Sequence, residues 1–214
     1  MSRIVILSGV TEVDDPWHDF TATSQAIADC LEDAGWTCTV ESTGRCDRAG
    51  LTHADLLIVN SGLASPPGPG TEPSAVLLDH LASDRPVLGV HAAANTFGAV
   101  PAWARRLGVR WAEGVSMHPP IGRQRLTPAA GTVLAGLDEV TVHDELYSHL
   151  ELLRPADVLL AHPLDGRDHP LVLARSEGRQ RTVYDALGHG VESYASATRR
   201  ELLRREVRWL LDEG

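Results

Sequence analysis

The residues of this sequence that are best suited to chemistry are histidines placed directly after β-like runs. His91 ends the apolar run Pro86 to Val90, and three alanines that could open a helix follow it. This order predicts a buried parallel strand and a sharp strand-to-helix turn, which in an open α/β sheet lies at the edge where ligands bind. Gly89-x-His91-x-Ala93 has the form of a nucleophile elbow with imidazole in place of a hydroxyl or thiol.

Two further histidines are expected at the same edge of the sheet. His189 stands between two glycines after a β-like run, and glycine there permits close approach of a ligand. A purely structural turn histidine is the alternative for this position. His18 lies in the loop after the first expected strand. Because the carboxyl ends of parallel strands meet at one edge, His18, His91 and His189 are predicted to share a pocket.

Acidic and aromatic side chains end another β-like run, Val142 to Tyr147. Adjacent strand residues point to opposite faces, so Asp144 and Glu145 cannot both enter one site unless the strand has already turned. A helix cap or a solvated turn is the alternative explanation of these acids. The polar or ionisable residues at strand ends and in the loops after them are Ser8, His18, Asn60, His91, Asn95, His118, Asp144, Glu145, Tyr147 and His189.

Hydrophobic periodicity predicts the elements that must position these residues. Strands are expected over 3–7, 36–41, 54–59, 87–90, 139–142, 157–161, 171–174 and 182–187, and helices over 23–34, 71–82, 101–107 and 198–211. Irregular structure with short edge strands is expected over 109–136. In the last helix, Leu202, Leu203, Val207, Leu210 and Leu211 would form the buried stripe, opposite Arg200, Arg204, Arg205 and Arg208. The β-α-β-β-α-β order of the first half predicts an α/β fold with a mainly parallel central sheet.

Composition restricts the class of protein. A chain of 214 residues fits one domain spanning 1–214, and 29 acidic against 19 basic residues give a net charge of −10, which disfavours nucleic acid as a partner. No apolar run approaches a membrane span, and the N-terminus lacks the features of a signal peptide, so we expect a cytoplasmic protein without a membrane partner. Cys30, Cys38 and Cys46 have no metal-binding or disulfide spacing and are interpreted as reduced thiols.

Four short motifs, in order and spacing, resemble the ThuA-like (trehalose utilisation) family over essentially the whole chain. They are Trp17-His18-Asp19-Phe20, Gly89-Val90-His91-Ala92-Ala93, Asp144-Glu145-Leu146-Tyr147 and Leu187-Gly188-His189. This family is similar in fold to class I glutamine amidotransferases, so the resemblance implies a flavodoxin-like α/β sandwich. It also implies a bacterial protein of disaccharide or other carbohydrate metabolism.

The amidotransferase triad does not transfer to this chain. Its cysteine nucleophile would fall at His91, its histidine matches His189, and the acid two residues later is missing because Val191 stands there and Glu192 follows. Imidazole is a poor acyl carrier compared with a thiolate. We therefore expect neither glutaminase activity nor an essential cysteine.

Two functional classes remain. The first is an enzyme acting on a sugar or keto-sugar, with His91, His189 and Glu145 as acid/base groups or with His18, His91 and His189 as ligands of a divalent metal. Glu145 is preferred over Asp144 on the resemblance alone. The second is a carbohydrate-binding or regulatory module; a homo-oligomer is compatible with either class. In both classes the residues expected to contact the ligand are His18, Trp17, Asn95, His118 and Tyr147.

Overall fold

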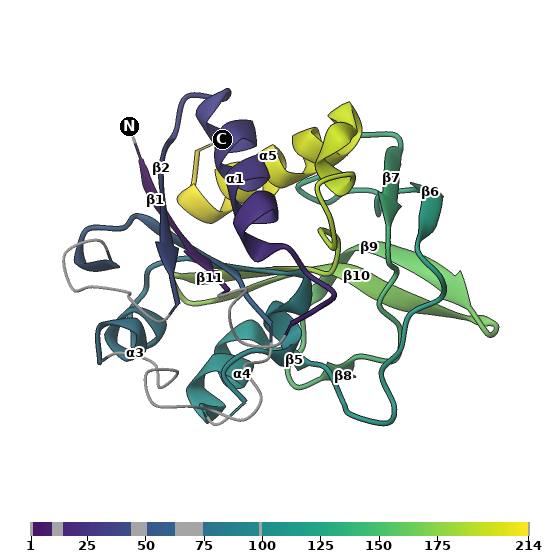
Figure 1. Ribbon diagram of the computed structural model, residues 1–214, viewed down its shortest axis with the longest axis horizontal. Coiled ribbons are helices and arrows are strands. Elements are labelled where there is room, and N and C mark those ends of the chain that lie inside the picture. The colour runs from purple at the N-terminus through teal and green to yellow at the C-terminus, as the bar shows by residue number, and fades with distance from the viewer. Residues whose placement is uncertain (1, 10–14, 44–50, 63–74, 99, 214) are drawn as a thin grey trace.

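A seven-stranded sheet forms the centre of the protein in the computed structural model, which describes residues 2–9, 15–43, 51–62, 75–98 and 100–213. The strand order is β2-β1-β3-β4-β11-β10-β9 (Figure 1). The first five strands in this order run parallel, and β10 and β9 are antiparallel to their neighbours. Their bounds are β1 Arg3–Ser8, β2 Thr37–Ser42, β3 Leu56–Asn60, β4 Val87–Val90, β9 Asp157–Leu164, β10 Arg167–Glu177 and β11 Gln180–Asp185. The predicted α/β fold with a mainly parallel sheet is confirmed.

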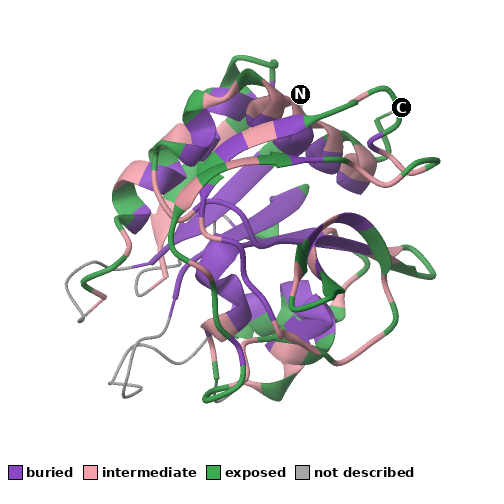
Figure 2. Cartoon of the chain, turned by 90° about the vertical axis from the view of Figure 1, so that its right-hand side faces the viewer, coloured by how far each residue is buried: buried purple, intermediate pink, exposed green. Residues whose placement is uncertain are grey.

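Helices cover both faces of this sheet. In Figure 1, α1 (Phe20–Glu32) and α5 (Ala197–Leu211) lie above the sheet, and α3 (Ala75–Ala82) and α4 (Pro101–Leu107) lie below it. Strands covered on both faces need continuous apolar runs, and every residue of β3 and β4 is buried (Figure 2).

Capping residues explain the start of α1 and both ends of α4. α1 begins three residues before the predicted start because the Asp19 side chain accepts a hydrogen bond from the Ala22 N–H at 2.9 Å. α4 has its predicted bounds, with Pro101 in its first turn and Gly108 at φ 80 as its C-cap. The first residues of the helix predicted over 71–82 lie outside the described residues.

Two small antiparallel pairs lie beside the central sheet. β5 (Val109–Arg110) pairs with β8 (Glu151–Leu152), and β6 (Gly122–Leu126) pairs with β7 (Val140–Asp144). The region predicted to be irregular, 109–136, therefore contains only β5 and β6. Two short 3₁₀ helices complete the described elements, η1 (His91–Asn95) and η2 (Ser193–Ala195).

The prediction for α5 is right about most of its apolar stripe and incomplete about its charges. Four of the five expected residues are buried, whereas Leu211 is only half-buried. Arg199 and Glu206 are also fully buried, and Arg199 Nη2 lies 2.6 Å from Asp185 Oδ2. The helix thus buries an ion pair, which hydrophobic periodicity does not detect.

Neither of the two described cysteines has a thiol suited to nucleophilic attack. Cys30 is buried in α1 and burial raises the pKa of its thiol, while burial raises the pKa of Cys38, in β2, to about 12. Both thiols are protonated at neutral pH and are poor nucleophiles. Cys46 lies outside the described residues.

Among the described residues, no helix has the length and apolar character needed to cross a membrane.

Candidate functional site

A cavity of about 580 Å³ opens at the carboxyl ends of the parallel strands. Its walls come from the loop after β1, the segment after β3, the turn after β4, the segment between β5 and β6, the segment after β7 and the loop after β11. The lining residues are Asp15, Trp17, His18, Gly62, Ala92, Asn95, Trp111, His118, Glu145, Tyr147 and His189.

His91 directly follows β4, and its Nε2 lies 3.0 Å from the Tyr147 hydroxyl and 3.7 Å from Glu145 Oε2, two groups that line the cavity. It is 1 % exposed and begins η1 with φ 46, a left-handed conformation that is uncommon for a residue with a side chain. The turn therefore leads into a short 3₁₀ helix rather than the helix that the alanines suggested. Trp103 holds η1 in place by donating from Nε1 to the Ala93 carbonyl at 2.8 Å.

Hydrogen bonds determine which nitrogen of His91 faces the cavity. Nδ1 lies 2.7 Å from the Ala186 carbonyl oxygen, which can only accept, so Nδ1 carries the proton and Nε2 carries the lone pair. The Tyr147 hydroxyl donates to that lone pair at 3.0 Å. Burial, with the nearby His18, holds the pKa of His91 well below its usual value, so the ring is neutral. Burial and the Glu145 carboxylate raise the pKa of Tyr147, which keeps its proton.

The His18 ring is also oriented through its Nδ1, in this case by a carboxylate. Its Nδ1 lies 2.9 Å from both oxygens of Asp15, and Oδ1 of Asp15 also accepts from the backbone N–H groups of Trp17 and His18. The ring then directs Nε2 away from Asp15, and this buried atom has no hydrogen-bond partner among the described residues. The His18 ring centre lies 5.1 Å from that of His91 and 4.9 Å from that of His189.

Glu145 lies between three imidazoles. Its Oε2 is 3.3 Å from His189 Nδ1 and 3.7 Å from His91 Nε2, and its Oε1 is 3.5 Å from His118 Nδ1. Burial works to raise the pKa of Glu145, but its interactions with His189 and His118 outweigh burial and lower it. The Glu145 carboxylate in turn raises the pKa of His189 against the effect of burial.

Four of these side chains could hold a metal ion together. One ligand atom from each of His18, His91, Glu145 and His189 lies within 4.8 Å of every other. Among the described residues this is the one group of three or more such side chains that meets this condition.

Seven of the eight sequence-predicted site residues line this cavity, and Trp17 is the most exposed of them, at 73 %. His91 does not line it and lies against two of the lining residues, Tyr147 and Glu145. The roles of all eight stay predictions. Two other strand-end residues have structural partners instead: Ser8 Oγ donates to the Phe20 carbonyl, and Asn60 Nδ2 donates to the hydroxyls of Thr23 and Ser24.

Four residues that line the cavity were not predicted as site residues: Asp15, Gly62, Ala92 and Trp111. Sequence reasoning also missed the supporting role of Asp144. Asp144 is fully buried and accepts hydrogen bonds from the backbone N–H groups of Glu145, Gly188 and His189. The sequence contained one signal for the role of Asp144. Side chains alternate along a strand, so one of the two adjacent acids, Asp144 and Glu145, had to point away from the site.

Comparisons with known proteins agree with this architecture. A family model described as "ThuA: Trehalose utilisation" matches residues 3–210. A ThuA-like protein from Parabacteroides merdae is 19 % identical with a TM-score of 0.77, over 98 % of this chain and 89 % of that one. No curated protein matches the chain.

Two further solved structures share the fold at low identity. A glutamine amidotransferase from Thermotoga maritima is 13 % identical with a TM-score of 0.60, over 99 % of this chain and 98 % of that one. A beta-galactosidase from Rahnella sp. R3 is 14 % identical with a TM-score of 0.66, over 98 % of this chain and 32 % of that one. At these identities the likeness shows the fold alone, and it confirms the expected amidotransferase-like architecture.

Proposed function

Because the chain belongs to the ThuA trehalose-utilisation family, we propose that it is an enzyme acting on a sugar or keto-sugar in the histidine-lined cavity. Family membership suggests a role in trehalose utilisation. The observation that carries the enzymatic proposal is the convergence of His18, His91, Glu145 and His189.

The shape and lining of the cavity suit a sugar ring. Its volume of about 580 Å³ lies within the range of small-molecule sites. The aromatic side chains of Trp17 and Trp111 offer apolar faces for the C–H groups of a sugar, and Asn95 and His118 offer hydrogen bonds to its hydroxyls. The reacting carbonyl or hydroxyl would lie near His189, Glu145 and the Tyr147–His91 pair.

A carbohydrate-binding or regulatory module on the same fold is the second candidate. The aromatic and amide side chains are sufficient for such a module, and Trp17 is exposed at the rim. Sugar binding does not require several ionisable groups to be taken out of water together, which costs free energy. The partly buried imidazole–carboxylate cluster therefore favours catalysis.

Glutaminase activity is not part of the proposal. Imidazole stands where the amidotransferase resemblance places the nucleophilic cysteine, and neither Cys30 nor Cys38 lines the cavity. Treatment of the purified protein with an alkylating reagent is expected to leave sugar turnover unchanged. Protection of one cysteine by a sugar, together with loss of turnover after alkylation, would contradict this.

The enzymatic proposal is tested by incubating purified protein with trehalose and with its singly oxidised keto derivative and analysing the products. His91→Asn and His189→Ala should lower turnover ~100-fold or more, the scale of a lost catalytic group. Asparagine is chosen at position 91 because it tolerates the left-handed backbone. His143→Ala, an exposed histidine, is the matched control. Undiminished turnover in folded His91→Asn protein would contradict the proposal, and sugar binding without any conversion would favour the binding module.

A further inference from the structure

We propose that His18, His91, Glu145 and His189 form a binding site for one divalent transition-metal ion. The catalytic use of that ion rests on the function proposed above, whereas its binding does not. The four residues come from the loop after β1, the end of β4, the segment after β7 and the loop after β11. The fold itself therefore assembles the site from segments far apart in the sequence.

The spacing of the ligand atoms suits a single ion. His91 Nε2 and His189 Nδ1 lie 3.7 Å and 3.3 Å from the same oxygen, Glu145 Oε2. Ligand atoms that lie ~2.1 Å from a tetrahedral ion are ~3.4 Å from one another. Only small shifts would bring these three atoms to coordination distance.

Groups outside the cluster prepare two imidazoles as ligands. Nδ1 of His18 faces the Asp15 carboxylate at 2.9 Å, and Nδ1 of His91 donates to the Ala186 carbonyl at 2.7 Å. A histidine ligand typically donates its second ring N–H to such an acceptor, which fixes the ring and its tautomer. In both rings the Nε2 lone pair is thereby available to the ion.

Unpartnered buried atoms are an independent sign of a missing ligand. His18 Nε2 and His189 Nδ1 are both inaccessible to solvent. His18 Nε2 has no hydrogen-bond partner among the described residues, and His189 Nδ1 faces Glu145 Oε2 at 3.3 Å, outside hydrogen-bond geometry. Leaving buried polar atoms unpaired costs free energy, so such atoms mark places where a water or an ion belongs. A cation would satisfy both atoms at once.

The lone pair of His91 Nε2 differs from that of His18 Nε2, because it already accepts a hydrogen bond from the Tyr147 hydroxyl. A cation there would replace the Tyr147 proton as the partner of Nε2. The Tyr147 hydroxyl would then be free to donate to a sugar oxygen in the cavity, which links the metal to the proposed activity.

The chemistry of the ligands restricts the identity of the ion. Three imidazoles and one carboxylate are typical of Zn²⁺, Fe²⁺, Co²⁺ and related ions, whereas Mg²⁺ and Ca²⁺ prefer oxygen ligands. The cavity lies over the cluster, so a sugar carbonyl or hydroxyl oxygen could approach the ion and be polarised by it.

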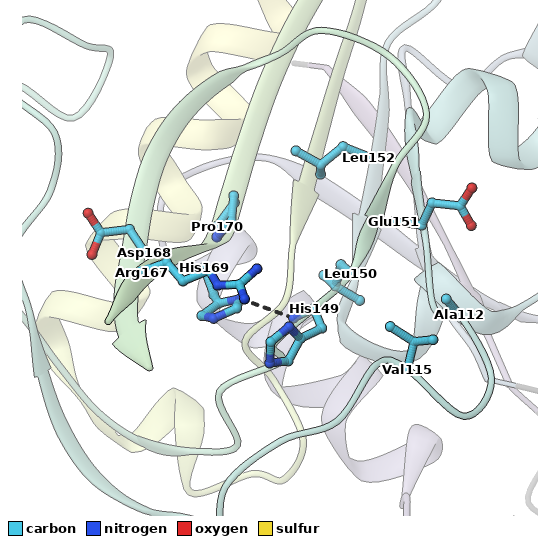
Figure 3. Close-up of a pocket in the computed structure, with 10 residues that line it drawn as sticks. All are labelled: Ala112, Val115, His149, Leu150, Glu151, Leu152, Arg167, Asp168, His169 and Pro170. Atoms are coloured by element: carbon cyan, nitrogen blue, oxygen red, sulfur yellow. Dashed lines mark hydrogen bonds between the residues drawn. The ribbon is translucent and has the colours of Figure 1, made fainter. Parts of the chain in front are cut away.

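A second histidine pair provides the matched control. His149 and His169 line another cavity of about 530 Å³ (Figure 3). The backbone N–H of His149 donates to His169 Nδ1 at 3.1 Å, so that lone pair is already used. Among the described residues no third ligand completes this pair to a metal-binding group. His149→Asn thus removes an imidazole near a cavity without touching the proposed site, and asparagine tolerates the left-handed backbone at this position, φ 57.

The test is calorimetric titration of tag-free, chelator-treated protein with Zn²⁺ and with Mn²⁺. We expect one ion per chain in the wild type and in His149→Asn. Glu145→Gln and His91→Asn should weaken binding ~100-fold or more. Asp15→Asn, which removes the carboxylate that orients the His18 ring, should weaken it ~10- to 100-fold. Tyr147→Phe should retain metal binding. Circular dichroism of each variant checks that it is folded.

The possible outcomes separate this inference from the proposed function. Absence of stoichiometric binding in the wild type, or unchanged affinity in folded Glu145→Gln and His91→Asn, overturns the metal site. Metal-free protein that still converts the sugar at the full rate overturns a catalytic role for the ion and leaves the proposed function standing. Metal binding without conversion of any sugar upholds the site and contradicts the proposed function.

Discussion

At the scale of single residues, Asp144 joins the two loops that carry Glu145 and His189. Its Oδ1 accepts from the N–H groups of Glu145 at 3.0 Å and His189 at 3.1 Å, and its Oδ2 accepts from Gly188 at 2.7 Å. Since Asp144 is 0 % exposed, it touches no ligand in the cavity and acts by positioning these backbones. A carboxylate is well suited to this because both of its oxygens are acceptors.

Asp144→Asn is expected to impair the site more than the fold. The amide replaces one acceptor oxygen by an NH₂ group, so at least one of the three N–H groups loses its partner and the connection between the two loops weakens. Metal affinity and sugar turnover should fall by ~10- to 100-fold, the range for groups that orient ligands. Titration calorimetry and thermal unfolding measure the two effects, with the exposed Asp165→Asn as control. A large loss of thermal stability with unchanged metal affinity would contradict the positioning role.

At the scale of elements, the turn after β11 depends on close backbone packing at Gly188. This residue has φ 122, and a Cβ atom there would lie 2.6 Å from Tyr194 Oη and 3.0 Å from Val90 Cγ1. The turn therefore follows a path that only glycine permits, and this path brings His189 to the cavity.

Gly188→Ala should destabilise the protein and displace His189. Gly178→Ala is the control, because Gly178 also has a positive φ, 62, whereas no atom of the described residues lies within 4 Å of the position that its added Cβ would take. Both variants carry the backbone cost of ~1 kcal/mol or more, and overpacking adds ~1–3 kcal/mol for Gly188→Ala alone. Urea unfolding gives the free-energy difference. Equal stability of the two variants would show that the turn can relax away from Tyr194.

At the scale of the whole molecule, a buried histidine far from the cavity makes folding sensitive to acid. His80 in α3 is 0 % exposed and its Nε2 lies 3.3 Å from the Pro86 carbonyl oxygen. Burial, with the positive charges of Arg85 and Arg106, lowers the pKa of His80 from 6.5 to about 4. In the unfolded chain the same ring takes up a proton near pH 6.5, so its contribution to stability is present above pH 6.5 and is lost as the pH falls toward 4.

His80→Gln should therefore reduce the loss of stability in acid. Between pH 7 and pH 5 the wild type should lose about 2 kcal/mol more unfolding free energy than the variant, as the difference between the two pKa values requires. Urea unfolding at the two pH values measures this. His143→Gln, at an exposed position, should behave like the wild type. Identical acid losses in His80→Gln and wild type would show that His80 is protonated without cost in the folded state.

The sequence by itself determined the elements whose signals are local. The apolar run before His91 predicted β4 and its turn, and Pro101 and Gly108 predicted both ends of α4, because strand burial and helix capping depend on residues close together in the chain. The expectation that His18, His91 and His189 share one edge followed from the same strand ends.

The tertiary structure alone decided how these residues are held. The partner of His91 Nδ1 is Ala186, 95 positions away, and Asp144 bonds Gly188 from 44 positions away. The ion pair of Arg199 and Asp185 is likewise buried only because α5 packs on the sheet beside β11. Tautomers, supporting hydrogen bonds and buried charges depend on which distant segments meet, and no pattern of neighbouring residues records that.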